Sequence, residues 1–200
     1  MKIGKRLTID VKSFMRKAPK KVKEDFGVSY ITGYQGTGKT YLGVYFLANY
    51  FTDLKIKTNI KSLKIPNCTI EYFDYIDDIT DDIEEYCIYL IDEISKKYTK
   101  DAKQDKKFYS WLQQSRKRKR YVYLITQEYL QIPTWLRGVA TTIFTTTKVP
   151  LLPIFKTYKG YPVLDDDTKE WGVQPISTFI YKRNKKYTDM YDTFEPVNVL

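Results

Sequence analysis

One eight-residue stretch constrains this chain more than any other. Gly33-Tyr34-Gln35-Gly36-Thr37-Gly38-Lys39-Thr40 matches G-x-x-x-x-G-K-[ST] at every fixed position, between a strand-like run (residues 28–32) and a helical pattern (residues 39–51). The glycines let the backbone curl until successive N–H groups point at one anion, and the helix N-terminus adds partial positive charge. Lys39 would reach β- and γ-phosphates, and the Thr40 hydroxyl would bind Mg²⁺. The stretch therefore predicts a nucleotide-binding site.

A second stretch has the polar end expected of a hydrolytic site. Residues 87–91 are a continuous apolar run, typical of a buried strand, and end directly in Asp92 and Glu93. Ligands of open α/β sheets bind at the carboxyl ends of the strands. We therefore expect Asp92 to hold the Mg²⁺ shell and Glu93 to polarise an attacking water. A kinase would need a site for an acceptor hydroxyl instead, so this pair favours ATP hydrolysis.

A third stretch, residues 121–126, is another buried-strand pattern and is followed by Gln127. If this strand lies between the two preceding core strands, Gln127 emerges beside the γ-phosphate. Its amide could then hydrogen-bond the phosphate or the water. This makes Gln127 a candidate sensor of nucleotide state.

The order of the patterns indicates an α/β fold. Strands alternate with helices up to about residue 150, which favours a mainly parallel sheet covered on both faces. Within it, residues 55–60 alternate like an exposed or edge strand, and residues 103–119 read as a helix. Residues 150–200 predict an antiparallel extension of the same domain. Residues 27–200 would thus form one domain, preceded by a basic N-terminal arm, residues 1–26.

The composition excludes several other kinds of site. The chain has no histidine and 2 cysteines in 200 residues, which rules out a histidine-dependent triad and a Cys/His zinc site. No apolar run approaches the about 20 residues of a transmembrane helix, and the N-terminus lacks the apolar core of a secretory signal. We expect no membrane span.

Charge is strongly segregated along this chain of formal net charge +10. Residues 1–26 hold nine Lys or Arg and three acids, residues 71–93 hold ten acids and no base, and residues 95–120 hold eleven Lys or Arg and two acids. Such blocks indicate a polyanionic partner or a charge-paired neighbouring subunit. Solvated helix faces are the alternative interpretation.

In this order, a phosphate loop, a strand ending in Asp-Glu and a strand ending in Thr-Gln resemble the FtsK/HerA superfamily of P-loop ATPases. Within it, the chain is most similar to viral genome-packaging ATPases and to zonula occludens toxin-like phage assembly ATPases. Further matching stretches are residues 57–60, the basic run around Arg116, residues 132–137 and residues 191–194. The resemblance spans about residues 27–195 and implies an additional-strand, RecA/FtsK-like P-loop NTPase fold.

The resemblance also implies roles for individual residues. Residues 33–40 correspond to Walker A with its catalytic Lys39, Asp92 to the Walker B metal support, Glu93 to the catalytic base and Gln127 to the sensor. ATP and Mg²⁺ would be the cofactors. The family forms rings, often of five or six subunits, with ATP between neighbours and an arginine supplied in trans. Arg137, and after it Arg116, are the candidates for this arginine.

The expected function is therefore that of a ring ATPase that moves double-stranded DNA. Packaging of this DNA into a viral capsid is the first expectation. Toxin-like proteins usually continue into a membrane-spanning helix and an extracytoplasmic domain. Neither occurs up to Leu200, so we favour packaging over export. A capsid portal or vertex protein would then be a partner, and the place of action would be the host cytoplasm or the virion.

Basic residues around the site are candidates for contacts to DNA phosphates. Lys96, Lys97 and Lys100 follow the two carboxylates, and Arg118 and Lys119 belong to the basic run of residues 116–120. Phosphate contacts bind DNA without reading its sequence, and their affinity falls steeply with salt. The same residues could instead pair with the acids of residues 71–93.

Three other functions stay open at this point. The chain could export DNA in phage assembly, phosphorylate a nucleoside or nucleotide as a P-loop kinase, or bind nucleotide as a non-catalytic switch. The sequence shows no Arg-rich lid motif, which counts against the kinase. Stimulation by DNA would identify the motor, a small-molecule acceptor the kinase, and absence of turnover the switch.

Overall fold

The computed structural model describes residues 26–51, 53–165, 171–195 and 197. The expected basic arm, residues 1–26, lies outside these ranges except for Phe26. The strands are β1 (Gly27–Thr32), β2 (Lys55–Thr58), β3 (Ile70–Tyr72), β4 (Cys87–Ile91), β5 (Tyr121–Ile125), β6 (Ala140–Lys148), β7 (Ile154–Leu164) and β8 (Trp171–Lys182). The helices are α1 (Lys39–Tyr50), α2 (Asp77–Thr80), α3 (Lys106–Gln113), α4 (Thr134–Arg137) and α5 (Lys185–Thr188), with 3-10 turns η3 (Ile94–Lys96) and η4 (Tyr129–Gln131).

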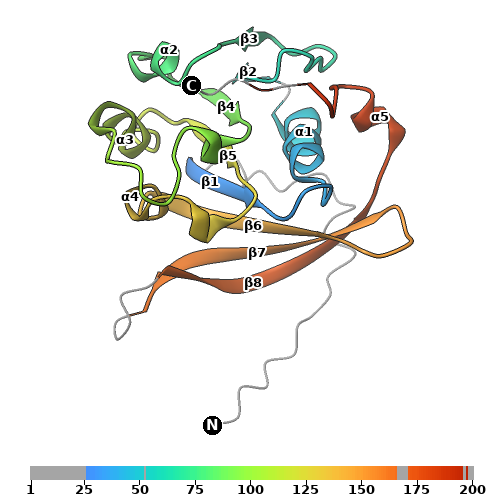
Figure 1. Cartoon of the computed structure of the whole chain (residues 1–200). Coiled ribbons are helices and arrows are strands. Elements are labelled where there is room, and N and C mark those ends of the chain that lie inside the picture. The colour runs from blue at the N-terminus through green and yellow to red at the C-terminus, as the bar shows by residue number, and fades with distance from the viewer. Residues whose placement is uncertain (1–25, 52, 166–170, 196, 198–200) are drawn as a thin grey trace.

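One eight-stranded sheet organises the molecule, in the order β3-β2-β4-β5-β1-β6-β7-β8 (Figure 1). The first six strands in this order run parallel, and β7 and β8 are antiparallel. This confirms the predicted α/β fold with its antiparallel C-terminal addition. β5 lies between β1 and β4, as the sensor hypothesis for Gln127 requires.

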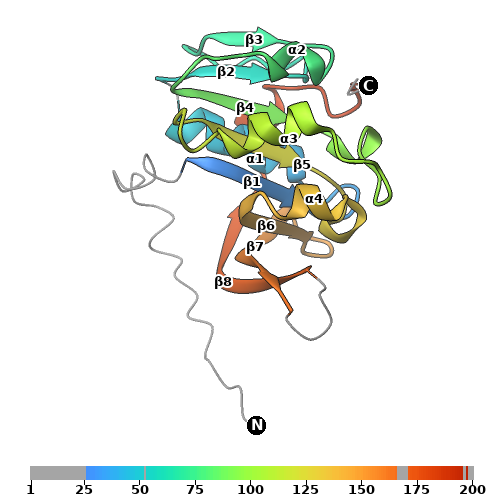
Figure 2. The same cartoon turned by 90° about the vertical axis from the view of Figure 1, so that its left-hand side faces the viewer.

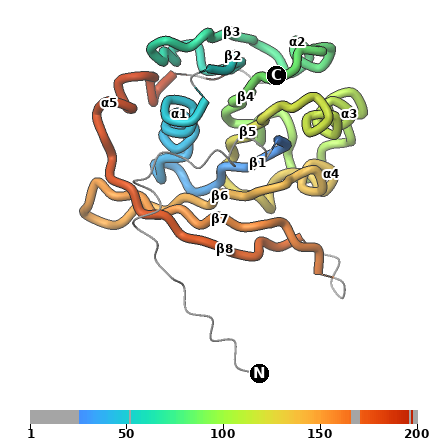
Figure 3. The backbone as a smooth tube through the Cα atoms, turned by 180° about the vertical axis from the view of Figure 1, so that it is seen from behind, coloured from blue at the N-terminus to red at the C-terminus, as the bar shows by residue number. Residues whose placement is uncertain are grey.

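Helices cover both faces of the parallel part. α1 and α5 lie on one face, and α2, α3 and α4 lie on the other (Figures 1 and 3). Each face buries its own apolar core, with Leu42 and Leu90 on the α1 side and Trp111 and Leu136 on the α3 side. The β7–β8 hairpin forms the lower edge in Figure 2. In the described ranges, no helix combines the length and apolar character needed to cross a bilayer.

The prediction of an edge strand over residues 55–60 was wrong. β2 is an inner strand between β3 and β4. Its lysines alternate with apolar residues, and this alternation is what suggested an exposed or edge strand. Lys57 is buried and forms ion pairs with Asp82, with Glu84 at 2.7 Å and with Glu71 at 3.6 Å. Burial would raise the pKa of Asp82, but hydrogen bonds from Lys57 and the Tyr89 hydroxyl lower it to about 2. The sequence pattern does not distinguish a buried lysine that has such partners from a lysine that is exposed to solvent.

The helix predicted over residues 103–119 is shorter, because a cap and a turn bound it. The Asp105 side chain accepts hydrogen bonds from the Lys107 and Phe108 amides, so α3 begins at Lys106. It ends at Gln113, and the following turns reach a positive φ of 53° at Lys119 before β5 begins.

The basic run of residues 116–120 ends in the protein core. Arg120 is 0% exposed, and its guanidinium donates to the carbonyl oxygens of Glu84 at 2.7 Å and Asp82 at 2.6 Å. The rings of Trp111 and Tyr89 lie 5.3 and 5.7 Å from its central carbon. Arg120 therefore binds the acidic segment (residues 71–93) to the start of β5 and is not part of an exposed basic patch.

We expect Arg120→Ala to lower the free energy of unfolding by roughly 3 kcal/mol, because the carbonyls of Asp82 and Glu84 would lose their donor and the buried side chain would leave a cavity. The exposed Arg116 of the same run is the matched control, and Arg116→Ala should change stability by less than about 0.5 kcal/mol. Urea unfolding of both variants measures the difference. Equal midpoints would contradict the structural role of Arg120.

Candidate nucleotide-binding site

The carboxyl ends of β1, β5 and β4 meet at one edge of the sheet. The Gly33 amide, just after β1, donates to the Gln127 carbonyl at 2.9 Å, and the Thr126 amide donates to Ile31 at 3.0 Å. On the other side of β5, Ile91 pairs with Leu124, so Asp92 follows at the same level. The three stretches that the sequence singled out thus lie side by side.

The loop between β1 and α1 is curled by three glycines with positive φ: Gly33 at 147°, Gly36 at 74° and Gly38 at 84°. The Thr37 hydroxyl donates to the Tyr34 carbonyl at 2.7 Å and lies 3.0 Å from the hydroxyl of Thr146 on β6. This contact ties the apex of the loop to the sheet.

α1 begins at Lys39 directly beneath the loop, and no side chain caps its N-terminus. Such an end attracts anions, because backbone N–H groups and the helix dipole point outward. The Lys39 ammonium group folds back over the loop and donates to the Tyr34 carbonyl at 3.1 Å. Burial lowers the pKa of Lys39, and the nearby charges of Asp92 and Glu93 oppose this shift.

Asp92 is the buried anchor of the site, with 7% of its surface exposed. One carboxylate oxygen accepts a hydrogen bond from the Thr40 hydroxyl at 2.8 Å, and the other accepts the Glu93 amide at 2.8 Å. The Asn59 side chain brackets its backbone, accepting the Asp92 amide at 2.9 Å and donating to the Asp92 carbonyl at 3.0 Å. Burial raises the pKa of Asp92, and the Thr40 hydrogen bond opposes this.

The donors at this point suit Mg²⁺. In the part of the chain that the structure describes, no group of three or more His, Cys, Asp or Glu side chains is placed to hold a metal. Mg²⁺ in nucleotide sites needs no such cage, because phosphates and water complete its octahedron around one or two protein oxygens. The Thr40 hydroxyl and the Asp92 carboxylate, 2.8 Å apart, supply oxygens of this kind.

Glu93 stands at a backbone kink, with a φ of 55°, where η3 begins. Its half-exposed carboxylate forms an ion pair with Lys96, whose ammonium group also lies 3.4 Å from the Val197 carbonyl. The left-handed kink turns the chain away from β4 directly after Asp92, so the two neighbouring carboxylates take different environments.

A cavity of about 540 Å³ lies over these groups. Its near wall contains residues predicted from the three motifs, namely Gln35, Gly36, Lys39, Thr40, Asp92, Glu93 and Gln127, and also Lys96, a candidate DNA contact. Gly33, Tyr34, Thr37 and Gly38 belong to the same loop but do not line this cavity. The structure therefore brings part of the predicted nucleotide-binding loop to one space with the predicted metal, base and sensor residues.

The far wall consists of residues that the sequence analysis did not assign. Arg183, which follows β8, lines the cavity together with residues 191–195 and Val197. Residues 191–194 were noted only as a matching stretch, and a single arginine after a strand gives no signal. Asn59 likewise lay in a matching stretch, residues 57–60, without an assigned role.

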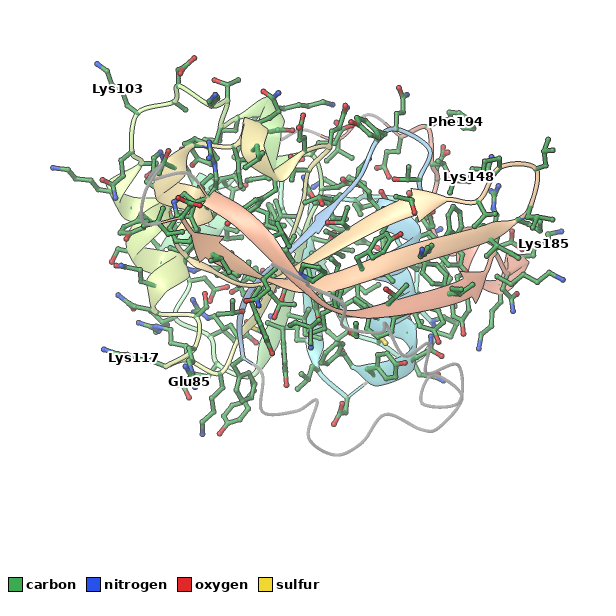
Figure 4. The ribbon with its side chains drawn as sticks, turned by 90° about the horizontal axis from the view of Figure 1, so that it is seen from below. Glu85, Lys103, Lys117, Lys148, Lys185 and Phe194 are labelled. Carbon is green, nitrogen blue, oxygen red and sulfur yellow. The ribbon has the colours of Figure 1, made fainter. Side chains whose placement is uncertain are left out.

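Neither candidate for the trans-acting arginine lines this cavity. Arg137 is buried, and its guanidinium donates to the carbonyls of Ile132 at 2.8 Å and Leu130 at 3.1 Å. It braces the segment after β5 in its own chain, so this geometry gives no support to the trans role. Arg116 is exposed and precedes β5, at the opposite edge of the sheet from the cavity. Figure 4 shows Lys117 at one end of the molecule and Phe194 of the cavity wall at the other.

The candidate DNA contacts are divided between two places. Lys96 lies at the cavity and Lys100 is exposed beyond it, whereas Lys97 lies 3.8 Å from Asp77. At the far edge, Arg118 donates to the Ile83 carbonyl at 2.8 Å and Lys119 to the Tyr86 hydroxyl. Several of these cations therefore contact the acidic segment of the same chain, and their roles in DNA binding stay predictions.

The loop glycines give a direct test of this geometry. A Cβ at Gly33 would lie 2.4 Å from the Thr146 carbonyl oxygen, whereas a Cβ at Gly36 would meet nothing within 4 Å. Gly33→Ala should lower the free energy of unfolding by about 3 kcal/mol or more, through overlap and strain. Gly36→Ala should cost about 1 kcal/mol, from its positive φ alone. Equal costs in urea unfolding would refute the loop conformation.

Comparison with known proteins supports the fold. No protein-family model and no curated protein matches the chain. Among solved structures, the N-terminal domain of zonular occludens toxin from Neisseria meningitidis has a TM-score of 0.61 at 21% identity, over 83% of this chain and 98% of that domain. The flagellar accessory protein FlaH from Methanocaldococcus jannaschii has a TM-score of 0.52 at 11% identity, over 78% and 84%. The genome packaging NTPase of Sulfolobus turreted icosahedral virus 2 reaches 0.48 at 13% identity, over 75% and 96%. The chain thus has the P-loop NTPase fold and resembles the toxin domain, as the order of its motifs predicted.

Proposed function

We propose that this chain hydrolyses ATP in the cavity between the glycine loop and the end of β4. The observation that carries the proposal is the 2.8 Å hydrogen bond between Thr40 and Asp92, which joins a phosphate loop to a buried carboxylate on a neighbouring strand. The triphosphate would lie against the loop amides and Lys39. Mg²⁺, when bound beside Thr40 and Asp92, would offset charge on the phosphates.

Two further residues support hydrolysis over simple binding. Glu93 and Gln127 line the same cavity, from the ends of neighbouring strands. The Glu93 carboxylate would take a proton from a water whose oxygen bonds to the γ-phosphorus, while the bond from that phosphorus to the β–γ bridging oxygen breaks. ADP and phosphate are then released. The Gln127 amide can orient the water, as a polar side chain does in other P-loop enzymes.

Replacing Glu93 separates chemistry from binding. Glu93→Gln should lower steady-state ATP hydrolysis by about 100-fold or more, because the amide cannot accept the proton, while a fluorescent ATP analogue still binds. Glu128→Gln is the matched control, since Glu128 is exposed one residue beyond Gln127 and does not line the cavity. Unchanged hydrolysis in Glu93→Gln would refute its role as the base.

We further propose that hydrolysis drives double-stranded DNA through a ring of five or six subunits. The net charge of +10 and the exposed Lys100 and Lys103 support a polyanionic partner, and the motif order supports a motor. Packaging into a capsid is our first assignment. Export of DNA during phage assembly is the second candidate, which the similarity to the zonular occludens toxin domain favours.

DNA stimulation tests the motor. At high protein concentration, double-stranded DNA of unrelated sequences should raise the ATPase rate several-fold. The affinity for DNA should fall by roughly 1,000-fold between 50 and 200 mM salt if about six phosphates are contacted. Specific activity should also rise with protein concentration, as ring assembly requires. A rate that ignores DNA at low salt would contradict the motor, and phosphate transfer to a nucleoside or nucleotide would identify a kinase.

A further inference from the structure

The far wall of the cavity carries a cation that the proposed mechanism does not use. Arg183 directly follows β8 and lines the cavity together with Lys39 and Thr40. Its backbone is fixed, because its amide donates to the Pro153 carbonyl at 2.7 Å. Among the described residues, no carboxylate forms an ion pair with its guanidinium. Within the described ranges, Arg183 is therefore a positioned charge without a carboxylate partner.

The surroundings of Tyr191 and Tyr41 are consistent with this position of Arg183. Burial raises the pKa of Tyr191 to about 12, the Arg183 charge acts against that rise, and the Asp92 charge adds to it. The Tyr41 hydroxyl, on α1, accepts the Asn184 amide at 3.0 Å and donates to the Lys182 carbonyl at 3.4 Å. The residues on both sides of Arg183 are thus bound to the start of α1, and the Arg183 charge acts on the wall that faces Asp92.

Three cations and four carboxylates are among the described residues that line the cavity. Lys96 is already paired with Glu93. On the far wall, Glu195 accepts the Ser62 amide at 2.8 Å and Asp192 accepts the Phe194 amide at 2.9 Å. Lys39 and Arg183 are then the cations among the described lining residues that can face a polyphosphate.

The wall that carries these groups is tied to the rest of the domain. The Asp192 amide donates to the Ser62 hydroxyl at 2.7 Å, and the Lys64 amide donates to the Met190 carbonyl at 2.7 Å. In Figure 1 the chain after α5 returns across the top of α1 toward β2. Because Arg183 and this wall belong to the same chain as the loop, one subunit contains both sides of the cavity.

We propose that Arg183 is a nucleotide-binding residue that acts in cis, with its guanidinium bound to the phosphates that Lys39 also contacts. A guanidinium suits this task because its donors match two phosphate oxygens at once. The inference rests on the proposed function, since it requires a nucleotide in this cavity. It adds a second phosphate-binding cation that needs no neighbouring subunit.

Equilibrium binding of fluorescent ADP and ATP analogues to the full chain, with Mg²⁺, tests this assignment. Arg183→Ala should weaken binding by about tenfold or more, and Arg183→Lys should restore part of it. Lys182→Ala is the matched control, because Lys182 is an exposed cation one residue earlier that does not line the cavity; its affinity should equal that of the wild type. Urea midpoints confirm that each variant is folded.

Mixing two variants distinguishes action in cis from action in trans. Lys39→Ala removes the other cation, so a mixture of Arg183→Ala and Lys39→Ala subunits should bind no better than the separate variants. Recovery of tight binding in the mixture would show that Arg183 acts on a neighbour and would overturn the cis assignment. Wild-type affinity in Arg183→Ala, beside a clear loss in Lys39→Ala, would overturn the inference and leave the proposed function intact. Wild-type affinity in Lys39→Ala would refute the proposed function itself.

Discussion

Parallel pairing of β1, β5 and β4 is the constraint on which the site depends. Because the carboxyl ends of parallel strands share one edge, the residues that follow them are brought together whatever their separation in sequence. The bond from the Gly33 amide to Gln127 and the bracket of Asn59 around Asp92 extend this pairing beyond the strands. A slip of one residue in either pairing would turn these side chains to the opposite face.

Two different polar networks lie at the carboxyl and amino ends of the parallel strands. At the carboxyl edge, Thr40, Asn59 and a backbone amide satisfy the buried Asp92, and they leave its carboxylate facing a cavity. At the opposite edge, both cations bind the acidic segment. Lys57 forms an ion pair with Asp82, and Arg120 donates to the carbonyls of Glu84 and Asp82. Buried polar groups are costly unless they are paired, so the second network stabilises the fold while the first remains open to a ligand.

The sequence predicted what depends on local pattern and missed what depends on partners far along the chain. The glycine loop, the ends of β4 and β5, and the parallel sheet with its antiparallel addition all follow from residue types at short spacing. Lys57 and Arg120 misled the interpretation, because buried and exposed cations read alike until their acidic partners are placed. Arg183 escaped notice for the same reason, since its position depends on β8 returning the chain to α1.

The most direct test of the account is a crystal structure of the chain with Mg²⁺ and a non-hydrolysable ATP analogue. We expect the phosphates to lie against the amides of residues 34–39, and the metal to take oxygens from Thr40 and, directly or through water, from Asp92. The hydrogen bond that now joins these two side chains would then be replaced by metal coordination. A nucleotide bound elsewhere, or a metal held without Thr40 and Asp92, would contradict the assignment of this cavity.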